Sequence, residues 1–109
     1  MTGGSAVFVN DDEGRYLAVN DAAIALLGYS REEFAALNAR DVSVASEDEL
    51  AEVYAMLKRA RSVRRIARLR RKDGVTGTIS YVGLESLVAG LPVIVAVTAP
   101  IDTFTPDSA

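Results

Sequence analysis

Short runs of hydrophobic residues alternate with turn residues over the first twenty positions. Ala6–Asn10 (AVFVN) and Tyr16–Asn20 (YLAVN) are rich in branched and aromatic side chains, and the polar stretch DDEGR separates them. Gly14 in this stretch can adopt the positive φ that a tight turn requires. Two strands so close in sequence are expected to pair as a hairpin.

Three helix starts follow, each marked by a capping residue. Asn20 precedes an apolar stripe that ends at Gly28, a residue type suited to the position just after a helix. Ser30 and Ser46 each have a glutamate three residues later, which is the pattern of a capping box. The pattern predicts a helix between Asn20 and Gly28, a short one from Ser30, and the longest from Ser46 to about Arg61.

The second half of the chain reads as three strands. Val63–Arg71, Val75–Val88 and Leu91–Ile101 are rich in β-forming residues, and Asp73-Gly74 between the first two is a strong hairpin signal. If the irregular stretch 38–45 holds one short helical turn, the element order is β-β-α-α-α-β-β-β. This order predicts an α+β fold, a five-stranded antiparallel sheet flanked on one face by short helices.

The length of 109 residues fits one small domain with a single core. We expect a flexible N-terminus over residues 1–5 and one domain over residues 6–103. Residues 104–109 are expected to form a frayed C-terminal tail or linker.

Composition excludes several kinds of chemistry. The chain has no cysteine and no histidine, so disulfides, thiolate nucleophiles and zinc-thiolate sites are excluded and the commonest general base is missing. We therefore expect no metal site. The most apolar run, Leu87–Ile101, is interrupted by Gly90 and Pro92 and is shorter than the roughly 20 residues of a membrane-spanning helix. No signal-peptide pattern opens the sequence, so we expect a soluble, cytoplasmic protein with no membrane partner.

Residues 58–72 (KRARSVRRIARLRRK) contain nine of the twelve Lys and Arg residues. In a strand, Val63, Ala67 and Leu69 would share one face with Arg65, and the other face would carry Arg64, Ile66, Arg68 and Arg70. A nucleic-acid surface is one interpretation, but the net charge is −3 and aromatic residues are few. The pattern favours a sheet strand whose arginines deter edge pairing or bind acidic groups of this chain or a partner, and no nucleic-acid partner is expected.

Three stretches together resemble the PAS domain family. YLAVNDAAIALLGYSREEF resembles the second strand and first helices of a PAS domain, RLRRKDG resembles the hairpin between its third and fourth strands, and VAGLPVIVAVTAPIDT resembles its last strand and exit. The match spans about residues 6–103. The resemblance implies a five-stranded antiparallel sheet cupped by helices around a small cavity. It also implies a sensory or protein-interaction role in a signalling protein, with an effector domain or partner protein, and no enzymatic activity of its own.

One departure from the family bears on cofactors. GYSREEFAALNAR is similar in spacing to the flavin-photosensor subgroup, which has Asn-Cys-Arg where this chain has Asn38-Ala39-Arg40. The chain has no Gln and no Asn after Asn38, so the side-chain amides that hold the flavin ring in that subgroup are missing. Haem-binding members usually ligate iron through His, and Met56 on the longest helix is more simply a packing residue. We expect neither a flavin photoadduct nor a His-ligated haem, and no cofactor is assigned.

The family places ligands between the helices and the sheet. For this chain the resemblance predicts a small apolar ligand in a pocket lined by Leu27, Phe34, Val42, Tyr54, Leu57, Leu69, Tyr81 and Val95. The same aromatic residues would equally complete a small closed core, which leaves a pure scaffold as another interpretation.

The last strand is apolar on both faces, because Val93, Val95 and Val97 alternate with Ile94, Ala96 and Thr98. An antiparallel sheet normally shows one polar face, so a second copy of the domain is expected to cover the outer one. The predicted homodimer or partner face comprises Arg64, Ile66, Arg68, Ile94 and Ala96. Shielding of a central strand by long Arg stems is the alternative.

Catalysis has little support in the sequence. The acid pairs Glu32-Glu33 and Asp48-Glu49 lie in first helical turns, where they compensate the helix dipole. No phosphate loop, nucleophile elbow or metal constellation is present, and no catalytic residue is predicted. The alternative function is a small proton-transfer enzyme on a ketosteroid-isomerase-like α+β cup. Coupling to an effector would pass through the exit, where Asp102-Thr103 matches the family's Asp-Ile/Val-Thr only in part.

Overall fold

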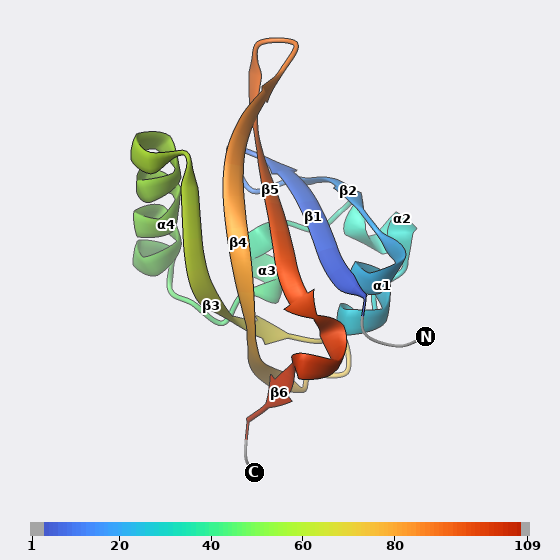
Figure 1. The fold of residues 1–109 in the computed structure, drawn as a ribbon. Helices are drawn as coiled ribbons and strands as arrows, with labels where there is room; N and C mark the ends of the chain where they lie inside the picture. The colour runs from blue at the N-terminus through green and yellow to red at the C-terminus, as the bar shows by residue number, and fades with distance from the viewer. Residues whose placement is uncertain (1–3, 108–109) are drawn as a thin grey trace.

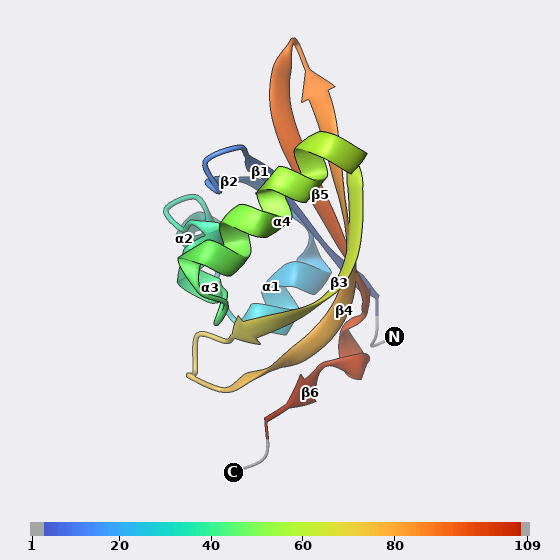
Figure 2. The same cartoon turned by 90° about the vertical axis from the view of Figure 1, so that its left-hand side faces the viewer.

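The computed structural model describes residues 4–107 as a curved antiparallel sheet with the helices on one face (Figures 1 and 2). The strand order across the sheet is β2-β1-β5-β4-β3, with a short β6 that pairs with β4. The strands are β1 Ser5–Asp11, β2 Tyr16–Val19, β3 Ser62–Arg70, β4 Thr76–Val88, β5 Leu91–Pro100 and β6 Thr105–Pro106. The predicted α+β fold and antiparallel sheet are confirmed.

Side-chain caps start all four helices of the described chain. The helices are α1 Asp21–Leu27, α2 Arg31–Phe34, α3 Ala39–Val42 and α4 Glu47–Ala60. Asn20 caps α1, and the predicted capping boxes at Ser30 and Ser46 are present. Asn38 starts α3 with a further capping box, which is the short helical turn expected within residues 38–45. No described helix is long and apolar enough to span a membrane.

The register of β5 shows which of its residues face the helices. Ala96 pairs with Phe8, which is buried under the helices, whereas Val95 pairs with Val9 and Leu84. Directly paired residues share a face, so Ile94, Ala96 and Thr98 point inward and Val93, Val95 and Val97 point outward. The prediction had this alternation reversed. The prediction failed because both faces of β5 are apolar, so hydrophobicity alone cannot identify the inner face.

Buried residues form two clusters under the helices. The larger core cluster lies beneath α1 to α3 and contains Ala6, Phe8, Val19, Ala23, Leu26, Leu27, Phe34, Val42 and Ile79. The smaller core cluster lies beneath α4 and contains Leu57, Val63 and Ile94, with Val53, Tyr54, Met56 and Tyr81 packed against it. The helix side of the sheet is therefore filled more heavily at the β1 edge than under α4.

Residues 104–107 differ from the expected frayed tail, and the last two residues of that predicted segment lie outside the described residues. After the 3-10 turn Ile101–Thr103, β6 pairs with the start of β4, where β5 has already ended (Figure 1). Phe104 packs on the larger core cluster, and a Cβ on Gly77 would lie 2.5 Å from its ring. The Thr76 hydroxyl donates to the Asp107 carboxylate at 2.6 Å. The segment is held in place because the aromatic ring of Phe104 packs against the core. The polar residues on either side of Phe104 make this contact hard to predict from the hydropathy pattern.

Candidate functional site

A cavity of about 310 Å³ lies between α3, α4 and the inner face of the sheet. Its apolar wall comes from every layer of the fold: Phe8, Leu27, Val42, Leu50, Val53, Leu57, Ala67, Leu69, Ile94 and Ala96. Its polar lining includes Asn10, Tyr16, Tyr54, Tyr81 and Thr98. The volume is at the lower end of the range of small-molecule pockets, roughly 300–1,000 Å³.

The structure brings six of the eight predicted pocket residues together around this cavity: Leu27, Val42, Tyr54, Leu57, Leu69 and Tyr81. Phe34 is buried at 1% exposure beside the cavity and packs its ring on Phe8, Tyr16 and Tyr29. Val95 lies on the outer face, and Ile94 and Ala96, which were predicted for the partner face, line the cavity instead. Arg64, Ile66 and Arg68 are exposed, and β3 register places them on the outer face, although Ile66 and Arg68 also border the cavity at its rim.

The contribution of the first hairpin to the cavity was not predicted. Phe8 and Asn10 on β1 and Tyr16 on β2 line it, as do Ala39 and Arg65. The alternation of β1, where Ala6, Phe8 and Asn10 are all buried, was the available signal. An Asn at an inward position of a strand is an unusual core residue and could have marked a polar cavity.

Three tyrosine hydroxyls face the cavity. Burial raises the pKa of Tyr16, and the neighbouring Tyr54 raises it further. Burial also raises the pKa of Tyr54, with a contribution from Tyr81, and that of Tyr81, where Arg65 opposes the shift. All three therefore remain protonated at neutral pH as hydrogen-bond donors.

All three tyrosines line the cavity, and the Tyr54 hydroxyl lies beside the β1–β2 turn. Within residues 4–107 no fully enclosed side-chain nitrogen or oxygen lacks a hydrogen-bond partner. No hydrogen bond contributes to the pKa of Tyr16, Tyr54 or Tyr81. The Thr98 hydroxyl, by contrast, accepts from the Ala6 N–H at 2.9 Å and donates to the Ala99 carbonyl at 2.7 Å. The cavity thus offers three uncommitted phenol groups.

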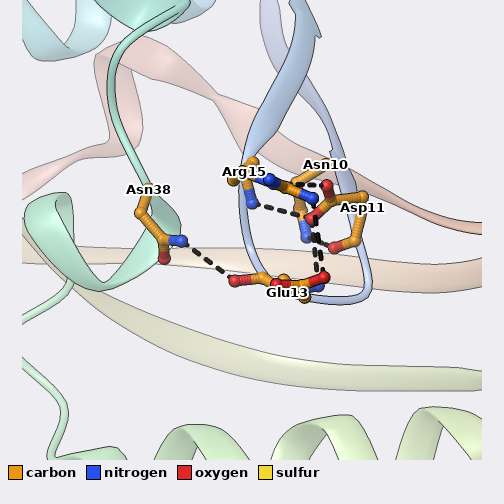
Figure 3. Close-up of polar contacts among 5 residues, drawn as sticks. All are labelled: Asn10, Asp11, Glu13, Arg15 and Asn38. Carbon is orange, nitrogen blue, oxygen red and sulfur yellow. Dashed lines mark hydrogen bonds and ion pairs between the residues drawn. The ribbon is translucent and has the colours of Figure 1, made fainter.

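The β1–β2 turn closes one end of the cavity. Its backbone bonds to the start of α3: the Asn38 side-chain amide donates to the Glu13 carbonyl at 2.9 Å (Figure 3). The Ala39 N–H donates to the Gly14 carbonyl at 2.8 Å. Gly14 has φ +88°, and a Cβ there would lie 2.6 Å from Asn38 Oδ1 and 3.2 Å from the Tyr54 hydroxyl. Only glycine combines this backbone conformation with so close an approach.

Charged side chains gather where α4 passes over β3. Arg65 Nη2 lies 2.7 Å from Met56 Sδ and 4.0 Å from Glu52 Oε1. Arg68 Nη2 lies 3.8 Å from Asp107 Oδ2. Glu49 accepts from the Ser46 N–H, and that bond lowers its pKa. The two acids of the cavity lining, Glu49 and Glu52, are both exposed, and the described residues hold no acidic cluster suited to a metal ion.

The outer face of the sheet is apolar along its centre. β5 register places Val95 and Val97 beside Val7 and Val9 on β1 and beside Val82 and Leu84 on β4. The β4–β5 hairpin extends this stripe well beyond the neighbouring strands (Figure 1), and Val88 and Leu91 at its tip are 59% and 67% exposed. A stripe of this kind is typical of a surface that another protein covers.

Comparison with known proteins gives one family and a consistent fold. A family model described as PAS domain matches residues 4–91. The crystal structure of a PAS domain from a two-component sensor histidine kinase is 20% identical, with a TM-score of 0.78 over 88% of this chain and 84% of that one. No curated protein matches the sequence.

Two further solved structures are similar. A domain of the sensory box sensor histidine kinase/response regulator from Geobacter sulfurreducens is 26% identical, with a TM-score of 0.74 over 87% of this chain and 82% of that one. The PAS domain of an HTR-like protein from Haloarcula marismortui is 18% identical, with a TM-score of 0.79 over 88% of this chain and 80% of that one. These likenesses concern the fold.

Proposed function

The chain belongs to the PAS domain family, as the match over residues 4–91 shows, and from this premise we propose that it is the ligand-sensing and interaction domain of a signalling protein. Its effector would be a further domain or a partner protein, as in histidine kinases, the kind of protein from which two of the similar structures come. The family membership expected from the sequence is thereby confirmed.

The cavity is the observation that carries the ligand-sensing role. A domain this small gains stability by filling its interior, yet about 310 Å³ stays open and is lined by tyrosine hydroxyls without partners. Such an arrangement is costly for a scaffold, because open space forfeits packing contacts and unpaired polar groups forfeit hydrogen bonds. A ligand that fills the space would recover both.

The proposed signal runs along β5. Ile94, Ala96 and Thr98 line the cavity, and the strand continues directly into the exit segment 101–106. A ligand would change how α4 rests on the inner face of the sheet, and β5 would carry that change to Phe104 and β6. The exit segment is the described part of the chain best placed to report on the cavity.

We further propose that the outer sheet face forms a homodimer. Its central residues are Val7, Val9, Val82, Leu84, Val95 and Val97, and Ile66 on β3 is 69% exposed beside them. Burying this stripe in a second copy would remove apolar surface from water at roughly 25 cal/mol per Å². The extended β4–β5 hairpin would enlarge the contact.

The proposal includes no flavin photoadduct and no His-ligated haem. Ala39 stands at the position of the photoreactive cysteine and lines the cavity, so the wall carries a methyl group where that chemistry needs a thiol. A proton-transfer enzyme has less support than a sensor, because both acids of the cavity lining are exposed at its rim.

Native mass spectrometry of freshly purified protein, compared with the same sample under denaturing conditions, tests both parts. A dimer carrying an additional small-molecule mass is the expected result. A dimer without added mass, together with no binding from a fragment library, would contradict the sensing role and leave an interaction module. A monomer at micromolar concentration would contradict the homodimer.

A further inference from the structure

We propose that the cavity recognises a small apolar monocarboxylate, held at its charged end by Arg65, Tyr54 and Tyr81. This inference rests on the proposed ligand-sensing function and specifies the ligand's chemical class. Three observations support it: the polarity of the free groups in the cavity, the incomplete pairing of Arg65, and the apolar wall opposite them.

Each of the three phenol groups in the cavity can donate a hydrogen bond. The hydroxyls of Tyr16, Tyr54 and Tyr81 stay protonated, since burial raises the pKa of each. They lie near one another, because Tyr54 and Tyr81 pack against the same small core cluster and all three tyrosines line one cavity. Grouped phenol donors match a ligand group with several acceptor lone pairs, and a carboxylate has about four.

Arg65 supplies the positive charge next to these donors. It pairs directly with Tyr81 across β3 and β4, and it lines the cavity. Its carboxylate partner Glu52 is 4.0 Å away, at the limit of an ion pair, and its shorter contact is to the Met56 thioether, a weak acceptor. The guanidinium therefore retains donors for a second, better oriented carboxylate.

The other charged groups at the rim are engaged. Arg68 is directed to Asp107, and Glu49 is held in the capping box of α4. A ligand carboxylate would compete with Glu52 for Arg65, and Glu52 is free to move because its side chain is 69% exposed. Arg65 is thus the cation that reaches the cavity from the inner face of β3, next to Tyr81, whereas Arg68 lies on the outer face.

The apolar part of the cavity lining favours an apolar ligand body. Leu27, Val42, Leu57, Leu69 and Ile94 surround the space, and no ionised side chain lies among them. Gly83 on β4 lets Val63 and Leu57 pack closely against the strand, since a Cβ there would lie 3.2 Å from Val63 and 3.6 Å from Leu57. A single charged end with a compact hydrocarbon body fits this division, whereas a dicarboxylate or a sugar does not.

The test compares two matched probe pairs by isothermal titration calorimetry: 4-ethylbenzoate with 4-ethylbenzamide, and octanoate with octanamide. Within at least one pair the carboxylate should bind about tenfold more tightly than the amide, because charge-assisted hydrogen bonds are about twice as strong as neutral ones. Arg65→Met should abolish that difference, and Tyr81→Phe should reduce it. Arg64→Met, one residue along β3 on the outer face, is the matched control and should leave it unchanged.

The outcomes separate this inference from the function on which it rests. Equal binding of acid and amide, or tighter binding of the amide, would overturn the carboxylate class and leave the cavity as a ligand site. Loss of the preference in Arg64→Met but not in Arg65→Met would overturn the assignment of the binding cation. No binding of any of the four probes at millimolar concentration would overturn the carboxylate class as well, and ligand sensing itself would then depend on the native mass measurement.

Discussion

The larger and smaller core clusters show two ways of building one interior. In the larger cluster Phe34 contacts three other aromatic rings, with centroids 5.4–6.1 Å apart, and the short helices α1 and α2 seal it. In the smaller cluster Leu57, Val63 and Ile94 are buried beneath α4 alone, and the cavity separates them from the aromatic rings. The first region is filled by aromatic rings, and the cavity lies between the two clusters, lined by residues of both.

This difference follows from the residues on each side. Aromatic rings that meet edge to face fill space efficiently, so nothing is left open around Phe34. Under α4 the facing strands carry Ala67, Gly83 and Ala96, which have small side chains or none, and these residues line the cavity together with Tyr54 and Tyr81.

Phe34→Ala should disrupt the larger core cluster and destabilise the domain more than truncation of any residue in the smaller one. Removing a fully buried ring that packs on three others should lower the free energy of unfolding by about 3–5 kcal/mol. Urea denaturation followed by circular dichroism measures it. A loss below about 1 kcal/mol would show that the aromatic rings do not dominate stability.

Leu57→Ala should cost less, about 2–3 kcal/mol, although Leu57 is as deeply buried as Phe34. One side of Leu57 already borders the cavity, so truncation removes fewer contacts. The same urea titration serves, with Phe34→Ala as the reference. If Leu57→Ala proved the more damaging, the cavity would be filled by side chains in solution.

Gly14→Ala tests the turn that closes the cavity. The positive φ and the close approach of Asn38 should together lower stability by about 2 kcal/mol. Gly74→Ala is the matched control, since Gly74 also has positive φ but nothing lies within 4 Å of its Cβ position. Equal losses in the two variants would mean that backbone strain alone matters and that the Asn38 contact does not.

Tyr16 packs on Phe34 in the larger core cluster and also lines the cavity. Its raised pKa predicts that the stability of the domain falls at alkaline pH. Its pKa is raised in the folded state, so above the usual value of 10.0 the unfolded chain loses the proton first. Stability conferred by the protonated form is therefore complete below about pH 10 and declines as the pH rises further. Tyr16→Phe should weaken this decline in urea midpoints measured from pH 8 to 11. An unchanged decline would place the Tyr16 hydroxyl in water.

Loss of the Glu33–Lys72 ion pair at acid pH is expected to have the smallest effect on stability. The Lys72 ammonium, at 2.8 Å, and the Ser30 N–H lower its pKa below 4.5. The stabilisation is present above pH 4.5 and is lost as the pH falls through the folded-state pKa. Glu33→Gln keeps a capping-box acceptor and should flatten the decline in melting temperature between pH 5 and 3. An identical acid profile would show that the pair contributes nothing measurable.

Local signals in the sequence predicted most of the fold. Asn20, Ser30 and Ser46 indicate where their helices begin, because a cap is a short-range interaction between neighbouring residues. The faces of β5 could not be predicted in the same way, because Val95 and Ala96 are both apolar and only the register with Phe8 distinguishes them. The order of residues 104–107 could not be predicted for the same reason. Phe104 packs against Gly77, which is distant in sequence and has no side chain that would indicate the contact.

Residues of the candidate site were likewise predictable where a local pattern identifies them, and not where their role depends on contacts distant in sequence. Tyr54 and Leu57 were identified because helical periodicity on α4 shows which face is buried. Arg65 was placed on the inner face but interpreted as part of a basic strand, since its relation to Tyr81 depends on pairing across the hairpin. Asn10 was missed because a polar residue in a short strand looks like the beginning of a turn.

The most direct test is a ¹H–¹⁵N NMR titration with 4-ethylbenzoate, which shows where in the molecule a ligand binds. The amides of α4 and of Ile94 to Thr98 should shift, and those of α2 should not. Ala96→Leu, which fills the cavity, should abolish the shifts, while Val95→Leu on the outer face of the same strand should leave them intact. Shifts centred on α2, or shifts that persist unchanged in Ala96→Leu, would contradict the assignment of the region under α4 as the ligand site.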